Sequence, residues 1–137
     1  MTGRDLTQFK NFKTDSELAR AIIELLPILE TPGLNSLCKK LRHNGKKVKV
    51  HLDLLEQLFA IQSVQKHALG SGKKLYYLCD PSLVSYFGGD QKRKLETWLQ
   101  TEARAQISYS MAMRTSLAYY RSSRGGKICA LLLLGRT

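Results

Sequence analysis

The chain has 137 residues, of which 43% are hydrophobic, so it is long and apolar enough to bury a core as one ordinary domain. This composition excludes a chain that is disordered throughout. The formal net charge of +11 favours polyanionic partners: nucleic acid first, an anionic membrane second and an acidic protein third.

The first predicted element is an amphipathic helix. Thr14, Asp15 or Ser16 can serve as its N-cap. Glu17 lies three residues after Thr14, as in a capping box. Pro27 is expected to bend the helix or to end it early. The apolar face recurs at helical spacing and comprises Leu18, Ile22, Leu25, Leu26 and Leu29.

A second, shorter helix is predicted after the break at residues 31–33. Its apolar face comprises Leu34, Leu37, Cys38 and Leu41. Asn44 and Gly45 then predict a helix stop. Residues 46–50, KKVKV, alternate lysine and valine as a short edge strand does. Residues 51–59 predict a third helix, whose inward face comprises Leu52, Leu55, Leu58 and Phe59.

Residues 67–80, HALGSGKKLYYLCD, allow two interpretations: a cradle for a nucleotide phosphate and the turn of a β-hairpin. A P-loop needs a glycine where His67 stands and a hydroxyl residue where Lys74 stands, and no helix pattern follows. Residues 75–79 instead favour a strand, and residues 61–68 alternate weakly between two faces. The segment therefore predicts a hairpin with a Gly-Ser-Gly-Lys turn and no free-nucleotide site.

This order of elements resembles a winged-helix domain over about residues 14–80. The segment from Ser36 to Gly45, SLCKKLRHNG, is similar to the helix-to-turn segment of many such domains. In DNA-binding members the third helix enters the major groove and the wing contacts the backbone or the minor groove. This chain departs from that pattern because Asp53 and Glu56 stand on the expected exposed side of its third helix. Its basic residues cluster instead on the second helix, the strand and the wing.

The last third predicts two further helices. Residues 81–87 form a short helix that ends at Gly88 and Gly89, where a domain break is the alternative to a continuous domain. Asp90 can cap a longer helix. The first turn of that helix contains Lys92, Arg93 and Lys94, where the helix dipole disfavours cations, so we expect an external anion or a nearby acid. The expected apolar face of this helix is Leu95, Trp98 and Leu99.

A second hairpin is predicted at the end of the chain. Residues 121–127 form a basic turn, and residues 128–134 read as a buried strand. The complete prediction is an α+β fold: a winged-helix-like helical N-terminal half with a β-hairpin wing, followed by a helix and a second β-hairpin. We expect one domain over residues 1–137, with the winged-helix-like part at about 14–80 and the extension at about 81–137.

The charge is unevenly distributed. Residues 1–37 carry four basic and five acidic residues, whereas residues 38–80 and 81–137 each carry nine basic and three acidic residues. The binding surface should therefore begin after the first helix. The candidate nucleic-acid-binding residues are Lys39, Lys40, Arg42, Lys46, Lys47, Lys49, Lys66, Lys73, Lys74, Arg121, Arg124 and Lys127.

Catalysis and metal binding have little support. The three histidines fall in separate elements without metal-ligand spacing, and no carboxylates pair for acid–base chemistry. We expect solvated histidines, no cofactor, no metal and no enzymatic activity. The cysteines Cys38, Cys79 and Cys129 are scattered, which favours neither a disulfide framework nor a zinc site. They favour an intracellular protein, in the cytoplasm, nucleus or nucleoid, that is not secreted.

Adjacent tyrosines allow two interpretations. Tyr76 and Tyr77 are neighbours on a predicted strand, so one should face the core and the other solvent. An exposed tyrosine beside a lysine can stack on a base of single-stranded nucleic acid. The alternative is a tyrosine packed with its hydroxyl hydrogen-bonded at the surface.

The leading functional prediction is a small, non-catalytic nucleic-acid-binding protein, with duplex DNA before RNA, in transcription, replication or genome packaging. The alternative is a protein–protein interaction module. It would form a homodimer or a partner contact through the leucine-rich helices or the C-terminal strand. A third class, a binder of membrane surfaces or acidic proteins, uses the same charge. We expect no stable membrane insertion, because the longest apolar run is only residues 128–134.

Overall fold

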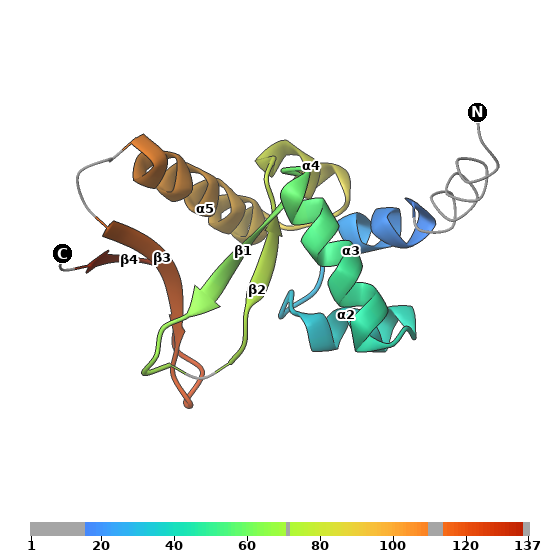
Figure 1. Cartoon of the computed structure of the whole chain (residues 1–137), viewed down its shortest axis with the longest axis horizontal. Coiled ribbons are helices and arrows are strands. Elements are labelled where there is room, and N and C mark those ends of the chain that lie inside the picture. The colour runs from blue at the N-terminus through green and yellow to red at the C-terminus, as the bar shows by residue number, and fades with distance from the viewer. Residues whose placement is uncertain (1–15, 71, 110–113, 136–137) are drawn as a thin grey trace, which may run out of the picture.

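The protein has a mixed α+β fold. The computed structural model describes residues 16–70, 72–109 and 114–135. The predicted N-caps Thr14 and Asp15 lie outside this part. A first helix covers residues 16–25. The elements that follow are α2 (Leu34–Leu41), α3 (Gly45–Gln57), β1 (Ile61–Lys66), β2 (Leu75–Leu78), α4 (Pro81–Tyr86), α5 (Gln91–Tyr109), β3 (Arg114–Arg121) and β4 (Lys127–Gly135) (Figure 1).

The four strands form one sheet in the order β2-β1-β3-β4. Both predicted hairpins are present, because β1 pairs antiparallel with β2 and β3 pairs antiparallel with β4. A short parallel pairing, Gln65 with Ala118 and Lys66 with Tyr119, joins the two hairpins. An isolated antiparallel bridge also joins Gly33 to Leu75 of β2. Residues before α2 therefore lie beside the first hairpin.

The main core lies between the first three helices and one face of the β1–β2 hairpin. Leu18, Ile22, Leu26 and Leu29 are buried, as their helical spacing predicts. The first helix ends at residue 25, in agreement with the effect expected of Pro27. From the strands, Ile61, Tyr76 and Leu78 complete this cluster. Figure 1 shows these helices on one side of β1 and β2, with α5, β3 and β4 on the other side.

The start of α3 corrects the expected stop and edge strand at residues 44–50. Asn44 does not end a helix but begins one, because its side chain accepts a hydrogen bond from the backbone N–H of Lys47 at 2.9 Å. Val48 is fully buried and continues the inward stripe of Leu52 and Leu55 at helical spacing. The lysine–valine alternation therefore reflects the first turns of a helix with one buried valine. At the other end, Leu58 and Phe59 are exposed rather than inward.

The first hairpin is covered on both faces. Tyr76 packs into the main core, whereas Tyr77 packs with Val64, Leu75 and Tyr119 in a second cluster. Both Tyr76 and Tyr77 are buried, so the expectation that one of them faces solvent is wrong. The cause is α5 and β3, which cover the face of β2 that a two-layer domain would leave exposed.

The orientation of α5 is opposite to the one expected. Leu95, Trp98 and Leu99 are exposed, and the helix buries Arg93, Glu96, Thr97 and Gln100. The buried side chains satisfy backbone groups elsewhere: Gln100 Nε2 donates to the carbonyl of Cys129 at 2.5 Å. This polar helix face is buried because its side chains donate hydrogen bonds to backbone carbonyls, those of Leu26 and Leu29 after the first helix and that of Cys129 in β4.

The second hairpin lies at the edge of the sheet. Because β4 is an outer strand, Ile128 is half exposed and residues 129–131 are only partly buried, the expectation of a buried strand is wrong for residues 128–131. The side chains of residues 132–135 lie outside the description. Among the described residues, no helix is both long and apolar enough to cross a membrane.

Candidate nucleic-acid interface

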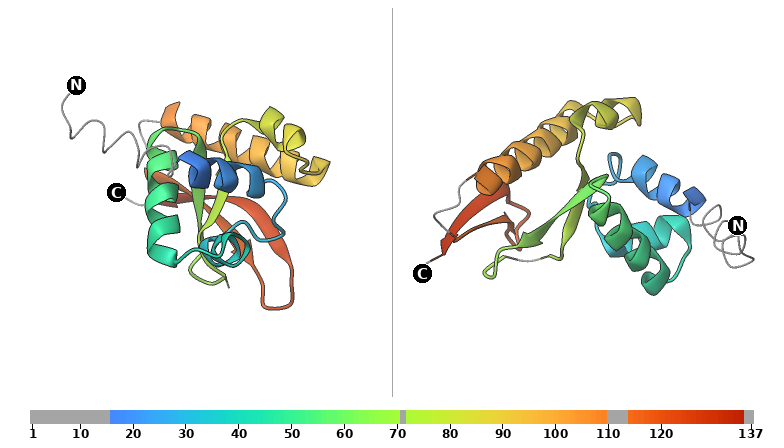
Figure 2. Two further views of the ribbon diagram at one scale, coloured as in Figure 1. Left: turned by 90° about the vertical axis from the view of Figure 1, so that its right-hand side faces the viewer. Right: turned by 45° about the horizontal axis from the view of Figure 1, so that its top comes forward.

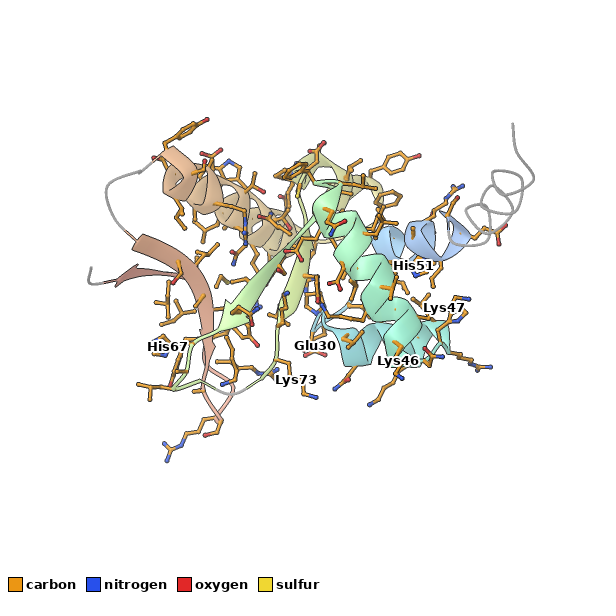
Figure 3. All side chains as sticks on the ribbon, in the orientation of Figure 1. Glu30, Lys46, Lys47, His51, His67 and Lys73 are labelled. Atoms are coloured by element: carbon orange, nitrogen blue, oxygen red, sulfur yellow. The ribbon has the colours of Figure 1, made fainter. Side chains whose placement is uncertain are left out.

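The twelve predicted binding residues fall into two groups. We call the first the helix surface: Lys39, Lys40, Arg42, Lys46, Lys47 and Lys49, at the end of α2 and the start of α3. We call the second the hairpin surface: Lys66, Lys73, Lys74, Arg121, Arg124 and Lys127, at the loops of the two hairpins. Lys46 and Lys73, one from each surface, lie along the lower edge of the molecule in Figure 3.

The helix surface is built on the turn between α2 and α3. Arg42 ends α2 in the left-handed backbone region, with φ of 55°, and its N–H donates to the carbonyl of Cys38. Two residues later Asn44 caps α3, so the chain reverses within a few residues. Lys46 and Lys47 then stand in the first turn of α3, which contains no acidic residue. Cations at this end of a helix are disfavoured by the dipole, and a bound anion would offset that cost.

Most cations of the helix surface have no carboxylate partner. Lys49 forms a 2.6 Å ion pair with Asp53, and this hydrogen bond raises the pKa of Lys49 above its usual value, against the effect of burial. Within the described part of the chain, the other five residues of this surface form no salt bridge: Lys39, Lys40, Arg42, Lys46 and Lys47. The charge on this surface is therefore available to an external anion.

The hairpin surface exists because the two hairpins pack against each other. The Tyr119 hydroxyl donates to the carbonyl of Lys73, and the His67 N–H donates to the carbonyl of Tyr119 at 2.7 Å. Gly72 has a φ of 107°, and a Cβ there would lie 2.7 Å from the Tyr119 hydroxyl oxygen. Glycine is therefore required at residue 72 for both its backbone conformation and its close approach to Tyr119. The left view of Figure 2 shows the two hairpin loops at the same end of the molecule.

Three lysines of the hairpin surface already have partners. Lys66 Nζ donates to the carbonyl of Gly70 at 3.3 Å. Lys74 Nζ lies 4.0 Å from Glu56 and 5.6 Å from the centre of the Tyr76 ring. Lys127 Nζ is 2.9 Å from Glu96. Lys73 and Arg124 have no ion-pair partner among the residues that the structure describes.

Glu96 is the centre of a buried polar network. It accepts hydrogen bonds from Lys127 at 2.9 Å and from the Tyr77 hydroxyl and the Cys129 thiol, both at 3.4 Å. Burial by itself would raise the pKa of Glu96, but Lys127, Cys129 and Arg93 together hold it below the usual value. The pKa values of Tyr77 and Cys129 are raised, first by burial and then by the Glu96 carboxylate. Lys127 therefore neutralises a buried charge, which limits its role toward external ligands.

A cavity of about 510 Å³, which we call the basic cavity, lies where the wing, the second hairpin, the start of α5 and the turn after the first helix meet. Three predicted binding residues line it: Lys73, Arg121 and Lys127. Lys92 and Arg93 also line it, although sequence reasoning did not place them in a site. The signal was present, because these two residues are unfavourably placed cations in the first turn of α5.

A smaller groove of about 230 Å³ lies between the two surfaces. It is lined by residues 33–36 at the start of α2 and by residues 72–75 before β2, together with Thr31. The groove therefore runs from the hairpin surface to the start of α2, the helix whose other end belongs to the helix surface.

The histidines are placed differently from one another. His51 is buried, against the expectation of a solvated side chain, and its Nδ1 donates to the carbonyl of Lys47 one turn earlier in α3. His67 Nδ1 accepts from the N–H of Leu69 at 3.2 Å. Across residues 16–70, 72–109 and 114–135, no group of three or more His, Cys, Asp or Glu residues is placed to hold a metal ion.

Comparison with family models, with curated proteins and with solved structures finds no match to this chain. The functional argument therefore depends on the residues and geometry described above.

Proposed function

We propose that this protein binds nucleic acid, duplex DNA in preference to RNA, through the helix surface and the hairpin surface, and that it does so without catalysis. The observation that carries the proposal is the group of unpaired cations at the end of α2 and the first turn of α3. Two consecutive helix ends present them together, and no carboxylate of a described residue forms a salt bridge with Lys39, Lys40, Arg42, Lys46 or Lys47. Phosphate groups are the ligands that match such a surface.

The order of elements over residues 16–78 supports this proposal, because it resembles the order in a winged-helix domain. The order is three helices followed by a two-stranded wing, and the Gly33–Leu75 bridge adds the third, minimal strand between the first helix and α2. In this arrangement α3 is the helix that enters the major groove. Although α3 carries Asp53 and Glu56, it begins at Gly45, so its first turns carry Lys46, Lys47 and Lys49. The start of this helix is therefore basic.

The salt dependence of binding tests the helix surface. If about five cations contact phosphates, log K should fall with log salt concentration with a slope of about −4 to −5. Replacing Lys46 and Lys47 with Ala should flatten the slope by about 2, because each phosphate contact contributes roughly 0.9. Fluorescence anisotropy with a labelled random duplex over a range of salt concentrations provides the measurement.

The matched control removes the same charge elsewhere. Arg20 and Lys94 lie outside both surfaces, so Arg20→Ala with Lys94→Ala should leave the slope within about half a unit of the wild-type value. Equal slopes for the two double variants would show that only net charge matters, and would remove the helix surface from the proposal. A single-stranded RNA of the same length, bound more tightly than the duplex, would reverse the order of preference.

A second candidate function is homodimerisation through β4. Within the described residues, β4 is nine residues long and has β3 as its only neighbour in the sheet. An unpaired strand edge can pair with a second copy of itself about a two-fold axis, because antiparallel pairing is self-complementary. Lys127 is the only charged residue of β4, and it forms a salt bridge with Glu96. The outer edge of β4 therefore carries little charge to oppose this pairing.

Sedimentation equilibrium at several protein concentrations tests dimerisation. Ile128→Lys should favour the monomer, because a lysine on an edge strand opposes pairing with another edge. Leu95→Lys introduces the same charge on α5, away from β4, and should not change the mass. A wild-type protein that is monomeric at all concentrations would exclude this candidate.

A further inference from the structure

The basic cavity contains a buried donor without a hydrogen-bond acceptor. Arg93 is only 8% exposed, and its two terminal nitrogens donate to the carbonyls of Leu26, Leu29 and Glu30. Its Nε has no hydrogen-bond partner in the described part of the chain. The nearest carboxylate oxygen, on Glu96, is 3.8 Å away. This nitrogen is shielded from solvent, so an anion in the cavity would stabilise the Arg93 guanidinium through its charge rather than by a hydrogen bond to Nε.

Cations outnumber carboxylates around this cavity. Its acidic residues are Glu30, Asp90 and Glu96, and its basic residues are Lys73, Lys92, Arg93, Arg121 and Lys127. Glu96 is already bound to Lys127, and an Asp90 oxygen accepts from the N–H of Arg93 as the cap of α5. The positive ends of Lys73 and Lys92 have no salt-bridge partner in residues 16–70, 72–109 and 114–135. The cavity therefore has a net attraction for an anion.

The N-terminus of α5 adds to this attraction. The helix is 19 residues long, has no acidic residue in its first turn, and begins at the cavity with Lys92 and Arg93. Its dipole places partial positive charge at this end. The structure thus brings the N-terminus of α5, capped by Asp90, together with the Arg93 guanidinium and two lysines that form no salt bridge with a described residue, around one open cavity.

We propose that the basic cavity is a binding site for a phosphate group. Phosphate is an anion with several strong acceptor oxygens, so it can accept from Lys73 and Lys92 at the same time, and its charge is attracted by the Arg93 guanidinium, which also lines the cavity. About 510 Å³ also leaves room for the organic part of a phosphate ester. The phosphate can come from a small phosphorylated compound or from the end of a nucleic acid. This proposal does not depend on duplex binding by the two surfaces.

The site is not a P-loop. Gly72 and Lys73 lie in a hairpin loop, and β2 rather than a helix follows them. The donors would be side chains from the first hairpin and α5 rather than consecutive backbone N–H groups of one loop. The sequence-based rejection of a P-loop nucleotide cradle therefore remains valid beside this proposal.

Titration of the full chain with inorganic phosphate, at constant ionic strength, tests the site. The probe is the side-chain Nε–H resonance of Arg93 in a ¹H–¹⁵N NMR spectrum. We expect it to shift with saturation, because a new anion lies beside the guanidinium that carries this proton. The Nε of Arg104 is an internal reference, since it already donates to Gln62 at 3.2 Å and does not line the cavity. An Arg93 resonance that does not shift, or that shifts no more than that of Arg104, would overturn the proposal.

Two single variants locate the phosphate. Lys73→Gln and Lys92→Gln should each weaken phosphate binding about three- to tenfold, since each removes one charged donor that is partly exposed to solvent. Lys94→Gln removes the same charge from the first turn of α5, and Lys94 lies outside both surfaces and does not line the cavity, so its effect should stay below about twofold. Equal effects of all three variants would show general charge attraction and would contradict a defined site.

A last comparison distinguishes the two sources of phosphate. A short duplex with 5′-phosphates is compared with the same duplex carrying 5′-hydroxyls, in the wild type and in Lys92→Gln. Tighter binding of the phosphorylated duplex, lost in Lys92→Gln, would identify the end of a nucleic acid as the ligand. Equal binding of the two duplexes, together with the Arg93 shift, would identify a small phosphorylated compound.

Discussion

At the scale of single residues, Arg42 and Phe59 have a backbone conformation that usually requires glycine. Phe59 has a φ of 59° and is 84% exposed. The N–H of Phe59 donates to Glu56 and that of Ala60 donates to Leu55, which together form a Schellman motif at the end of α3. Glycine is the usual residue at this position, because a Cβ there costs roughly 1–2 kcal/mol. Because the Phe59 side chain is mainly in solvent, its packing does little to offset this backbone strain.

The first prediction concerns this strain. Phe59→Gly should raise the free energy of unfolding by about 0.5–1 kcal/mol, because the gain in the folded state exceeds the entropy cost of glycine in the unfolded chain. Phe59→Ala retains the Cβ and should give no such gain. Urea unfolding followed by circular dichroism measures both. A loss of stability in Phe59→Gly would mean that the ring makes contacts that its exposure does not indicate.

The second prediction concerns the Glu96 network. The folded-state pKa of Glu96 is depressed, so its network stabilises the fold above the unfolded pKa of about 4.5, and this contribution is lost as pH falls through the folded pKa. Lys127→Met removes the strongest of the groups that lower this pKa. We expect a loss of roughly 2–4 kcal/mol at pH 7 and a smaller difference from the wild type near pH 4.

Arg124→Met is the matched control for Lys127→Met, because it changes the same charge in the same hairpin and Arg124 has no carboxylate partner among the described side chains. Its unfolding free energy should follow that of the wild type from pH 4 to pH 7. If Lys127→Met also follows the wild type over this range, the ammonium group does not support Glu96.

At the scale of elements, α5 shows that the apolar side of a helix need not be the buried side. Leu95 is 63% exposed, whereas Gln100 is fully buried and holds the carbonyl of Cys129 in β4. Arg93 likewise donates hydrogen bonds to three carbonyls in the turn that follows the first helix. The polar face of α5 therefore connects the first helix to the second hairpin. The outer face contributes little to the stability of a single chain.

The third prediction follows from this orientation. Leu95→Gln should change the free energy of unfolding by less than about 0.5 kcal/mol, since the side chain is mainly in solvent. Gln100→Ala should cost about 1–3 kcal/mol, because it leaves the Cys129 carbonyl without its partner. Thermal or urea unfolding of the two variants decides between the orientations. The reverse order of effects would restore the sequence-based expectation that the leucine face is inside.

At the scale of the whole molecule, the cations occupy two separate surfaces of the protein. The helix surface belongs to α2 and α3, and the hairpin surface depends on contacts between two hairpins that are far apart in the chain. Tyr119 and Gly72 make these contacts, as described above. If one duplex reaches both surfaces, the contribution of each surface to binding should be independent of the other.

The fourth prediction concerns the wing. Lys73→Ala with Lys74→Ala should weaken specific and non-specific duplexes by similar factors, on the order of 1–2 kcal/mol in total, because phosphate contacts carry no sequence information. The melting temperature should change little, since Lys73 makes no salt bridge with a described residue and Lys74 only a long one to Glu56. Anisotropy titrations give the affinities, and the loss should add to that of Lys46→Ala with Lys47→Ala. Unchanged DNA affinity would assign the wing a purely structural role.

Local chemistry in the sequence determined both hairpins and the order of the helices, but not the start of α3. The spacing of Leu18, Ile22 and Leu26 defined a helix face, and the glycines of residues 70–72 defined a turn, because such signals act over a few residues. Asn44 could not be assigned in this way, since asparagine serves at helix starts and helix ends alike. The burial of Val48 in the core showed that Asn44 begins a helix.

Only the tertiary structure decided which faces are covered and which charges meet. Tyr77 is buried because α5 and β3 pack on the outer face of β2, and no pattern within β2 encodes that neighbour. The inverted face of α5 has the same cause, since Gln100 and Arg93 are buried by carbonyls of distant segments. The basic cavity is likewise a product of folding. It joins residues as far apart as Pro27 and Lys127, and sequence spacing carries no information on contacts at that range.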